Sequence, residues 1–410
     1  MPLAAVRSRD VPDGAELAAV GREAGLDAVG VTSAEPFATT RAHLERRRTA
    51  GLSDSMAFTY RRPERSTDPG RALPDARSLV VGARSYRRTA GPEAGPGPPV
   101  GPEAGPEVAG GRPAGRVARY AWQDHYAALR DALGAVAERL RADGWRARVL
   151  ADDNALVDRE AAYRAGIGWY GKNANLLVPG EGSWFVLGSV VTDAPLDPTG
   201  RRVADGCGGC TRCIGSCPTG AIVAPGVVDA RRCLAWLLQV EGSFPREHRE
   251  ALGDRLYGCD DCQTSCPVNL RAERAGPDPP AAAGDAQVVV DIVDLLDRSD
   301  EDLMARHGRW YVPRRQARYL RRNALVVLGN TAAPDSAGAV GAVRRALRHD
   351  DPLVRGHAVW AARRLGRDDL LGAVAGDPDP FVREELHAAV RPRRPDPVRP
   401  APRPVHLSVR

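Results

Sequence analysis

The chain has 410 residues, 43% of them hydrophobic, and carries a formal net charge of +6. This length suits two to four domains with sizeable cores, and the charge permits a polyanionic partner without requiring one. No run of eighteen apolar residues occurs, and Arg7, Arg9 and Asp10 stand where an export signal would be apolar. We therefore expect a soluble, cytoplasmic protein with no membrane partner.

The basic residues are almost all arginine. Lys and Arg together number 58, yet lysine occurs only as Lys172. Such a bias is typical of a GC-rich genome, so the arginine excess is weak evidence for nucleic-acid binding. Lysine should persist where arginine cannot replace it, which makes Lys172 a candidate for a compact charge or donor in a cofactor pocket. The alternative is that Lys172 persists by chance and has no special role.

Residues 1–195 are predicted to form a mixed α/β domain. A helical pattern precedes the strand-like segment AVGVT, and SLVVGARSY (78–86) has the Val-rich run of a second strand. Residues 87–115 are rich in Gly, Pro and Ala and contain GPEAGP twice. That composition cannot pack a core, so we expect a disordered loop there.

A helix is expected after this loop, because apolar residues return at helical spacing and Gly144 ends the pattern. The spaced residues are Leu129, Leu133, Val136 and Leu140. The segments RARVLADD and SWFVLGSVVTD are typical of two further strands. Between them, REAAYRAGIGWYGKNANLLV predicts a helix, a glycine-broken turn and an apolar run.

All eight cysteines fall within residues 207–266. The first four and Pro218 follow C-x2-C-x2-C-x3-C-P, the bacterial ferredoxin spacing, in which the fourth cysteine ligates the other cluster. The later run C-x2-C-x3-C-P lacks one ligand, which Cys233 supplies. We therefore predict two 4Fe-4S clusters in a ferredoxin-like domain at 196–275. The first would be held by Cys207, Cys210, Cys213 and Cys266, and the second by Cys217, Cys233, Cys259 and Cys262.

Two other interpretations fit the cysteine pattern less well. A disulfide framework belongs to small domains in oxidising compartments, and a long chain without an export signal fits neither condition. Structural zinc also uses C-x2-C pairs, but zinc sites rarely show two runs that both end in Cys-Pro.

Residues 285–390 are predicted to form HEAT-like helical repeats, followed by a disordered tail at 391–410. Three segments share a basic residue followed by Ala and aliphatic residues, with Ala324 and Ala358 at matching places. An ordinary helical bundle is the alternative. A dense basic surface is also expected here, able to lie along an RNA backbone or simply to be solvated. It comprises Arg314, Arg315, Arg318, Arg321 and Arg322.

The ordered motifs resemble those of epoxyqueuosine reductases from about residue 15 to residue 390. They are ADDNALVDREAAYRAGIGWYGKNANLL, GSWFVLG, CGGCTRCIGSCPTGAI, DARRCLAWL, YGCDDCQTSCPVN and YLRRNALVVLGN. The resemblance implies an α+β multidomain enzyme: a cobalamin-binding α/β domain, a ferredoxin-like domain and HEAT-like helices. It implies reduction of epoxyqueuosine to queuosine at the wobble position of tRNA, with electrons passing through two 4Fe-4S clusters to cobalamin.

The resemblance also implies roles for individual residues. Asp152 matches the family's proton donor, and we expect burial beside the corrin to raise its pKa. A helix N-terminal aspartate is the alternative, and Asp153 and Asp158 lie close enough to be confused with it. Arg159 and Asn173 match residues that contact corrin or substrate.

Tyr120 falls in a segment similar to the family's Arg-Tyr-Ala, and we expect it at the cofactor. The family's Asp-Tyr-His order departs here to Asp124-His125-Tyr126, which puts a role for His125 in doubt. None of the eight histidines lies in an Asp-x-His-x-x-Gly motif for cobalt, so the cobalamin expectation comes from the resemblance alone.

The implied partners are a tRNA with a GUN-type anticodon bearing epoxyqueuosine and a low-potential electron donor, and a monomer is expected. One competing hypothesis is a small-molecule corrinoid reductase similar to reductive dehalogenases, which typically have export signals and no HEAT-like tail. Another is an electron-carrying ferredoxin fused to a helical scaffold, which would not bind cobalamin.

Overall fold

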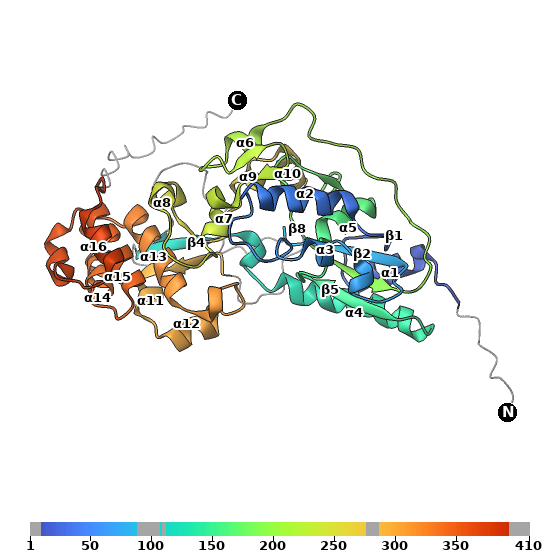
Figure 1. The fold of residues 1–410 in the computed structure, drawn as a ribbon, viewed down its shortest axis with the longest axis horizontal. Helices are drawn as coiled ribbons and strands as arrows, with labels where there is room; N and C mark the ends of the chain where they lie inside the picture. Colours follow the sequence, from blue (N-terminus) through green and yellow to red (C-terminus); the bar gives the residue numbers. More distant parts are fainter. Residues whose placement is uncertain (1–9, 88–106, 109–111, 276–286, 393–410) are drawn as a thin grey trace, which may run out of the picture.

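The computed structural model describes residues 10–87, 107–108, 112–275 and 287–392. The N-terminal α/β region lies at one end of an elongated molecule, and the C-terminal helices lie at the other (Figure 1). The cysteine-bearing segment packs between these two regions. No helix in the described ranges has both the length and the apolarity needed to cross a membrane.

A four-stranded antiparallel sheet forms the centre of the N-terminal region. In spatial order its strands are β1 (Ala28–Ser33), β2 (Ser78–Ser85), β8 (Phe185–Thr192) and β5 (Ala147–Ala151). All four coincide with the predicted strands. The two central strands are almost wholly buried, in keeping with their Val-rich runs.

Helices cover both faces of this sheet. On one face, α1 (Gly14–Glu23) and α4 (His125–Ala142) pack over Val80 and Val190. On the other, α5 (Asp158–Arg164) packs over Leu79 and Val81. Neighbouring residues of β2 therefore face opposite layers, as the two-residue period of a strand requires. Two further helices lie on the α5 side, α2 (Ala38–Thr49) and α3 (Pro63–Ser66).

The Asp-His-Tyr order at 124–126 has a local structural reason. The Asp124 side chain accepts a hydrogen bond from the Ala127 amide at 2.9 Å and caps α4, while His125 is buried as the first helical residue. Tyr126 follows on the first turn of α4.

A second sheet joins three distant parts of the chain. Strand β4 (Arg112–Val117) pairs in parallel with β11 (Arg255–Tyr257) and antiparallel with β12 (Val289–Asp291). The two-residue β3 (Glu107–Val108) also pairs with β4. Because β11 belongs to the cysteine segment and β12 begins the C-terminal region, β4 holds both of them to the N-terminal region.

Strand β4 corrects the prediction of a disordered loop over 87–115, whose last four residues lie in this strand. Composition alone does not distinguish Gly115 of this strand from the glycines of a loop. A Cβ at this position would come within 2.7 Å of Leu256 and 2.8 Å of Ile292, so glycine is needed for close packing in the sheet. Residues 88–106 and 109–111 of the predicted loop lie outside the described residues.

The cysteine segment is built from short elements. They are α6 (Arg212–Gly215), β9 (Ile222–Ala224), β10 (Val227–Val228), α7 (Leu234–Leu237), α8 (Arg246–Leu252), α9 (Asp261–Thr264) and α10 (Pro267–Arg274). Just before it, β6 (Trp169–Tyr170) and β7 (Leu176–Leu177) form a small hairpin. Short 3-10 helices are η1 (Pro69–Arg71), η2 (Arg119–Ala121), η3 (Ala230–Arg232), η4 (Pro313–Arg315) and η5 (Asp368–Val374).

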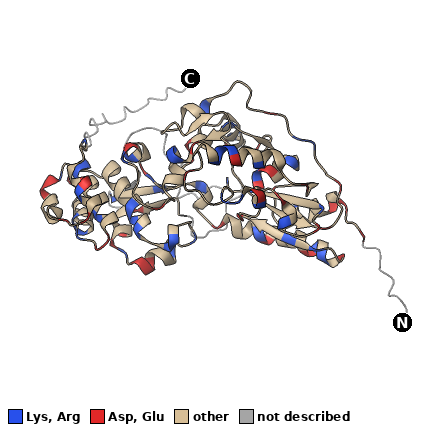
Figure 2. Cartoon of the chain, viewed as in Figure 1, with Lys and Arg blue, Asp and Glu red and all other residues tan. Residues whose placement is uncertain are grey.

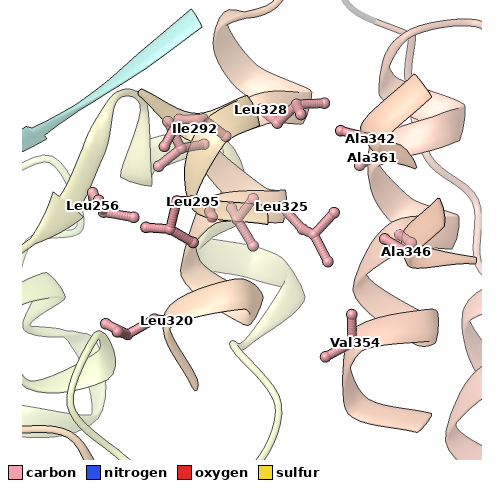
Figure 3. Close-up of a cluster of buried hydrophobic side chains, with 14 of the residues drawn as sticks. Leu256, Ile292, Leu295, Leu320, Leu325, Leu328, Ala342, Ala346, Val354 and Ala361 are labelled. Atoms are coloured by element: carbon pink, nitrogen blue, oxygen red, sulfur yellow. The ribbon is translucent and has the colours of Figure 1, made fainter. Parts of the chain in front are cut away.

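The C-terminal region is mainly helical between residues 292 and 387. Its helices are α11 (Ile292–Asp297), α12 (Asp300–His307), α13 (Arg318–Thr331), α14 (Ala337–Ala346), α15 (Pro352–Arg364) and α16 (Pro380–His387). Figure 3 shows leucines of α11 and α13 facing small residues of α14 and α15. Ala324 and Ala358, which marked the repeat pattern, are fully buried. The predicted tail lies outside the described residues from residue 393.

The five predicted RNA-facing arginines do not share one surface. Arg314 and Arg315 are exposed in η4 and Arg318 is half-buried, whereas Arg321 and Arg322 are buried. The prediction is wrong for these last two. Figure 2 shows basic residues interspersed with acidic ones along the described part of the chain.

The buried arginines bind backbone carbonyls of neighbouring segments. Arg322 donates to the carbonyls of Val240 and Gly242, each at 2.7 Å, and to two further carbonyls of the same segment. Arg321 bonds the carbonyl of Arg298 and pairs with Asp300. Helical spacing groups arginines on one face but does not say whether that face is solvated.

We expect Arg322→Leu to lower the free energy of unfolding by about 2 kcal/mol or more, because buried carbonyls lose their donor. The measurement is urea unfolding of the cluster-loaded protein under anaerobic conditions. Arg314→Leu is the matched control and should change stability by about 0.5 kcal/mol at most, since Arg314 is exposed. Equal effects of the two changes would contradict a structural role for Arg322.

Candidate active site

A cavity of about 1100 Å³ lies between the N-terminal region and the cysteine segment. Its wall includes Tyr86 at the end of β2, Tyr126 of α4, and the stretch that joins β5 to α5. The volume is at the upper end of the range for small-molecule sites, so the cavity suits a large cofactor together with part of a substrate.

Asp152 lies directly after β5 and opens onto this cavity. Its backbone is left-handed, with φ of 54°, a conformation that aspartate tolerates better than most residues. Partial burial raises the pKa of the Asp152 carboxyl, and Asp153 adds to the rise while Arg130 opposes it. The direction is the one expected of a group that must hold a proton near neutral pH.

Asp158 and Arg159 begin α5 and line the same cavity. Burial raises the pKa of Asp158 well above its usual range, the charge of Asp152 raises it further, and Arg159 opposes the shift. Burial likewise raises the pKa of Tyr126, and the same three charged residues act on it. These four side chains thus form one electrostatically coupled group on the wall.

Tyr120 and Asn173 both line the cavity, as the resemblance implies for cofactor contacts. The Tyr120 hydroxyl accepts a hydrogen bond from Gln239 at 3.0 Å. The Asn173 amide donates to the backbone carbonyl of Cys262 at 3.2 Å. Asn173 therefore ties the cavity wall to the cysteine run.

Lys172 does not line the cavity, and its placement differs from the expected cofactor contact. The ammonium group donates to the carbonyl of Gly208 at 2.6 Å, which places it on the loop between the first two cysteines. Lys172 and Asn173 are neighbours in the turn between β6 and β7, and of the two only Asn173 lines the cavity. The single lysine of the chain thus contacts the cysteine loop and does not line the cavity.

The cysteines fall into two groups of four, and all are half-buried free thiols. The pKa of Cys213 is raised by burial and then by the charges of the other three thiols in its group. The pKa of Cys262 is raised in the same way within the second group. The groups are Cys207, Cys210, Cys213 and Cys266, and Cys217, Cys233, Cys259 and Cys262.

This grouping fits two 4Fe-4S clusters, because each set supplies the four thiolates that one cluster takes. It is also the crossed arrangement predicted from spacing, with Cys217 and Cys266 each in the group of the other run. In the described part of the chain, no three Cys, His, Asp or Glu side chains converge tightly enough to hold a single metal ion.

Only the second group of cysteines reaches the cavity. All four of its members line the wall, and no member of the first group does. Burial raises the pKa of Cys233 and Cys259 as well as that of Cys262. The Cys217 sulfur accepts a hydrogen bond from the Ala221 amide at 3.1 Å, a contact of the kind that tunes cluster potentials.

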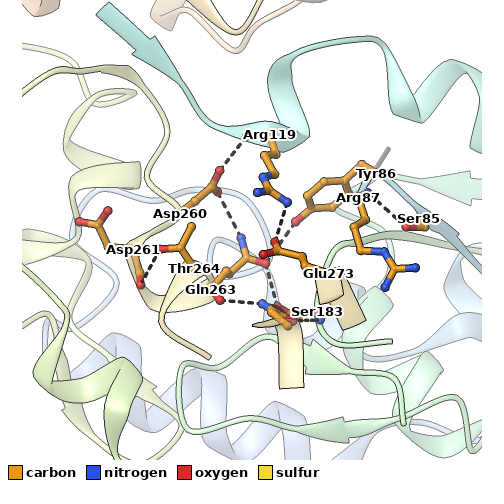
Figure 4. Close-up of polar contacts among 11 residues, drawn as sticks. Ser85, Tyr86, Arg87, Arg119, Ser183, Asp260, Asp261, Gln263, Thr264 and Glu273 are labelled. Atoms are coloured by element: carbon orange, nitrogen blue, oxygen red, sulfur yellow. Dashed lines mark hydrogen bonds and ion pairs between the residues drawn. The ribbon is translucent and has the colours of Figure 1, made fainter. Parts of the chain in front are cut away.

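A polar network fixes the cysteine segment against the N-terminal region (Figure 4). The Gln263 side chain accepts hydrogen bonds from Tyr86 at 3.2 Å and Ser183 at 2.9 Å. The same side chain donates to Asp260 at 3.2 Å, and Asp260 accepts from the Arg119 amide at 2.7 Å. Because Gln263 follows Cys262 directly, the network sets where this part of the second cysteine group lies.

Sequence reasoning missed Tyr86, Tyr126 and Gln263 as residues of the site. Gln263 had a usable signal, since it is a polar residue between two cluster cysteines. Tyr86 closes a predicted strand, where side chains often reach a site. Tyr126 gave no signal, because its cavity position depends on how α4 crosses the sheet.

The comparisons with known proteins support these regions individually. A family described as a 4Fe-4S double cluster binding domain matches residues 206–269. A family described as HEAT repeats matches residues 314–391. The expected ferredoxin-like and HEAT-like parts of the fold are thereby confirmed.

Similarity to whole proteins spans most of the chain. Epoxyqueuosine reductases of Bacillus cereus and Xanthomonas campestris are 32% and 34% identical to it, over 88% and 89% of this chain and 90% and 100% of theirs. A crystal structure of epoxyqueuosine reductase with an epoxyqueuosine-modified tRNA-Tyr stem loop has a TM-score of 0.78 and 29% identity, covering 91% of this chain and 96% of that one. The Bacillus subtilis structure, with its catalytic loop swung out of the active site, has a TM-score of 0.76 and 28% identity over the same shares.

We expect Cys266→Ala and Cys217→Ala to remove different clusters, each variant keeping about half of the iron. Iron analysis and electron paramagnetic resonance of the reduced protein are the measurements. Cys266→Ala should lose the same signal as Cys213→Ala, and Cys217→Ala the same signal as Cys262→Ala. If Cys217→Ala and Cys213→Ala instead lose one common signal, the crossed assignment is wrong.

Proposed function

The chain belongs to the epoxyqueuosine reductase family, and on that premise we propose that it reduces epoxyqueuosine to queuosine at the wobble position of tRNA. This reaction is the final step of queuosine biosynthesis. The observation that carries the proposal is the cavity, which Asp152 and the second cysteine group both line. A proton donor and an electron donor therefore face one substrate-sized space.

The electron route follows from the two cysteine groups. The first group would hold its cluster away from the cavity, and the second group would hold its cluster at the cavity wall, because only the second group lines that wall. We propose that the first group would hold the cluster that accepts electrons from a low-potential donor, and that the second group would hold the cluster that passes them on to the cavity. Holding the two clusters on interleaved cysteines keeps them close, as one-electron transfer between them requires.

Cobalamin is the proposed electron acceptor in the cavity. The residues present fit such a group in two respects: the volume suits a large cofactor, and four cluster cysteines lie on the wall beside it. Arg159, Asn173 and Tyr120 would hold the cofactor from their places on that wall. When bound, cobalamin would supply a reduced cobalt able to donate electrons to the epoxide carbon.

The chain's own residues would manage the proton. An opening epoxide develops negative charge on oxygen, and a positioned acid lowers the barrier by neutralising it. Asp152 can serve because it faces the cavity and has a raised pKa. The related Bacillus subtilis epoxyqueuosine reductase has a catalytic loop that bears an aspartate, which supports this role for the loop after β5.

The substrate is proposed to be a tRNA with a GUN-type anticodon, in line with the stem loop bound in one relative. The modified base must leave the stack to enter the cavity. Arg314 and Arg315 are the proposed phosphate contacts. Both are exposed in η4, and Arg314 pairs with Glu241, two residues beyond the cavity residue Gln239. The monomeric state and the cytoplasmic location stay predictions.

The test of the function is anaerobic turnover. Protein with clusters and cobalamin reconstituted would receive a strong reductant and tRNA carrying epoxyqueuosine, and the digested nucleosides would be weighed by mass spectrometry. We expect loss of one oxygen, dependent on cobalamin. No conversion by protein with both clusters and cobalamin bound would contradict the tRNA function and favour a small-molecule corrinoid reductase. Failure to retain any corrinoid would favour an electron carrier.

In the same assay we expect Asp152→Asn to lose activity by about a hundredfold or more, because the amide has no proton to give. Wild-type turnover should fall as pH rises through the raised pKa of Asp152, since only the protonated form is an acid. Asp153→Asn is the matched control and should stay active, because the Asp153 side chain caps a turn and is not on the wall. An active Asp152→Asn enzyme would rule out this donor.

For tRNA binding, we expect the double change of Arg314 and Arg315 to Ala to weaken affinity and to reduce the salt slope by about one to two. Fluorescence anisotropy of a labelled anticodon stem loop across salt concentrations measures both. Arg141→Ala, which changes an exposed arginine of α4, is the control and should have no effect. An unchanged salt slope in the double variant would show that η4 does not contact the tRNA phosphates.

A further inference from the structure

The proposed reaction needs two protons as well as two electrons. Both carbon–oxygen bonds of the epoxide break, a carbon–carbon double bond forms, and the oxygen leaves as water. The electrons come through the clusters from a low-potential one-electron donor. Asp152 can deliver one proton, and it must be protonated again before the same oxygen can take the second.

A second carboxyl lies on the same wall. Asp158 lines the cavity from the first residue of α5, six positions after Asp152 in the chain. Its Oδ1 atom is buried and has no hydrogen-bond partner within the described residues. A buried carboxylate oxygen without a donor is unfavourable, so this position favours the neutral acid, which carries a proton.

The charges around Asp158 also favour its neutral, protonated form on balance. Asp152 and Asp153, on the loop before α5, disfavour a second negative charge, whereas Arg159 on the same helix favours one. From α4, Tyr126 faces the pair and Arg130 acts on Asp152. Arg159 is exposed, and the Asp158 Oδ1 atom accepts no hydrogen bond from it in the described part of the chain, so desolvation prevails over the charge of Arg159.

We propose that Asp158 is a positioning residue that stores the second proton and returns it to Asp152 after the first transfer. The step is an exchange: the Asp158 carboxyl becomes a carboxylate while the Asp152 carboxylate becomes a carboxyl. It proceeds directly or through one water, and Asp158 regains its proton from solvent between turnovers. This inference rests on the proposed function, but the protonation of Asp158 can be tested without substrate.

The first experiment is infrared spectroscopy of the cluster-loaded protein near neutral pH, in H2O and D2O. A protonated carboxyl gives a carbonyl band that shifts in D2O. We expect Asp158→Asn to remove one such band and the matched control Asp153→Asn to leave it in place. If the band survives in Asp158→Asn, Asp158 is not the proton store and the proposal fails.

The second experiment is single turnover by enzyme reduced beforehand, with the tRNA substrate. Asp158→Asn should slow conversion by about tenfold or more with an unchanged KM and iron content, and it should alter the pH profile. Asp158→Glu, which restores an acid, should recover most of the rate and the infrared band. Wild-type rates in Asp158→Asn would overturn the proposal.

The two hypotheses fail in different ways. If the wild-type protein converts no tRNA, the proposed function fails while the infrared result still reports on Asp158. If Asp158→Asn does not fold, the Glu variant decides the matter: a folded Asp158→Glu protein without the band contradicts storage of a proton at this position.

Discussion

The placement of the second cysteine group on the cavity wall is the constraint on which the rest of the structure depends. Burial raises the pKa of Cys233, Cys259 and Cys262, so forming their thiolates there is unfavourable without a cation. Iron offsets that cost by binding the thiolate form, which couples cluster assembly to closure of the wall. Because these cysteines come from separate segments, the wall exists only when those segments are held together.

Three features hold the segments in place. Strand β4 pairs with both β11 and β12, so the cysteine segment and the C-terminal helices share one sheet. On the other side, the Gln263 network bonds the cysteine run to Tyr86 and Ser183 of the N-terminal region. Arg322 adds a buried anchor from α13 to the same segment. Each of these contacts is made by directional hydrogen bonds, so together they fix the position of the cluster side of the cavity.

The fold and the site could be predicted from the sequence where the spacing of residues is set by the group they bind. Cysteine spacing predicted both groups, since a cluster needs thiolates at set distances along a short loop. Sequence patterns gave wrong predictions where a residue's environment depends on packing against segments distant in the chain. Gly115 looked like a loop residue because the sequence does not show Leu256 against it. Arg322 looked solvated because helical spacing does not reveal which face of a helix is covered. Lys172 contacts the cysteine loop through Gly208 and does not line the cavity.

The carboxyls show why a site of this kind combines burial with charge. Protons and electrons must reach one oxygen, yet a site that supplies electrons carries negative charge, which by itself favours protonated acids nearby. This effect acts on Asp152 in the loop after β5 and on Asp158 at the start of α5. The pKa of each carboxyl is raised, and the charge of Asp152 contributes to the rise at Asp158. When Asp152 has given up its proton, its negative charge raises the pKa of Asp158 and so disfavours loss of the Asp158 proton to solvent. Transfer of that proton to Asp152 leaves only one negative charge on the pair. Electrostatic coupling between the two groups therefore favours transfer between them over loss of the proton to water.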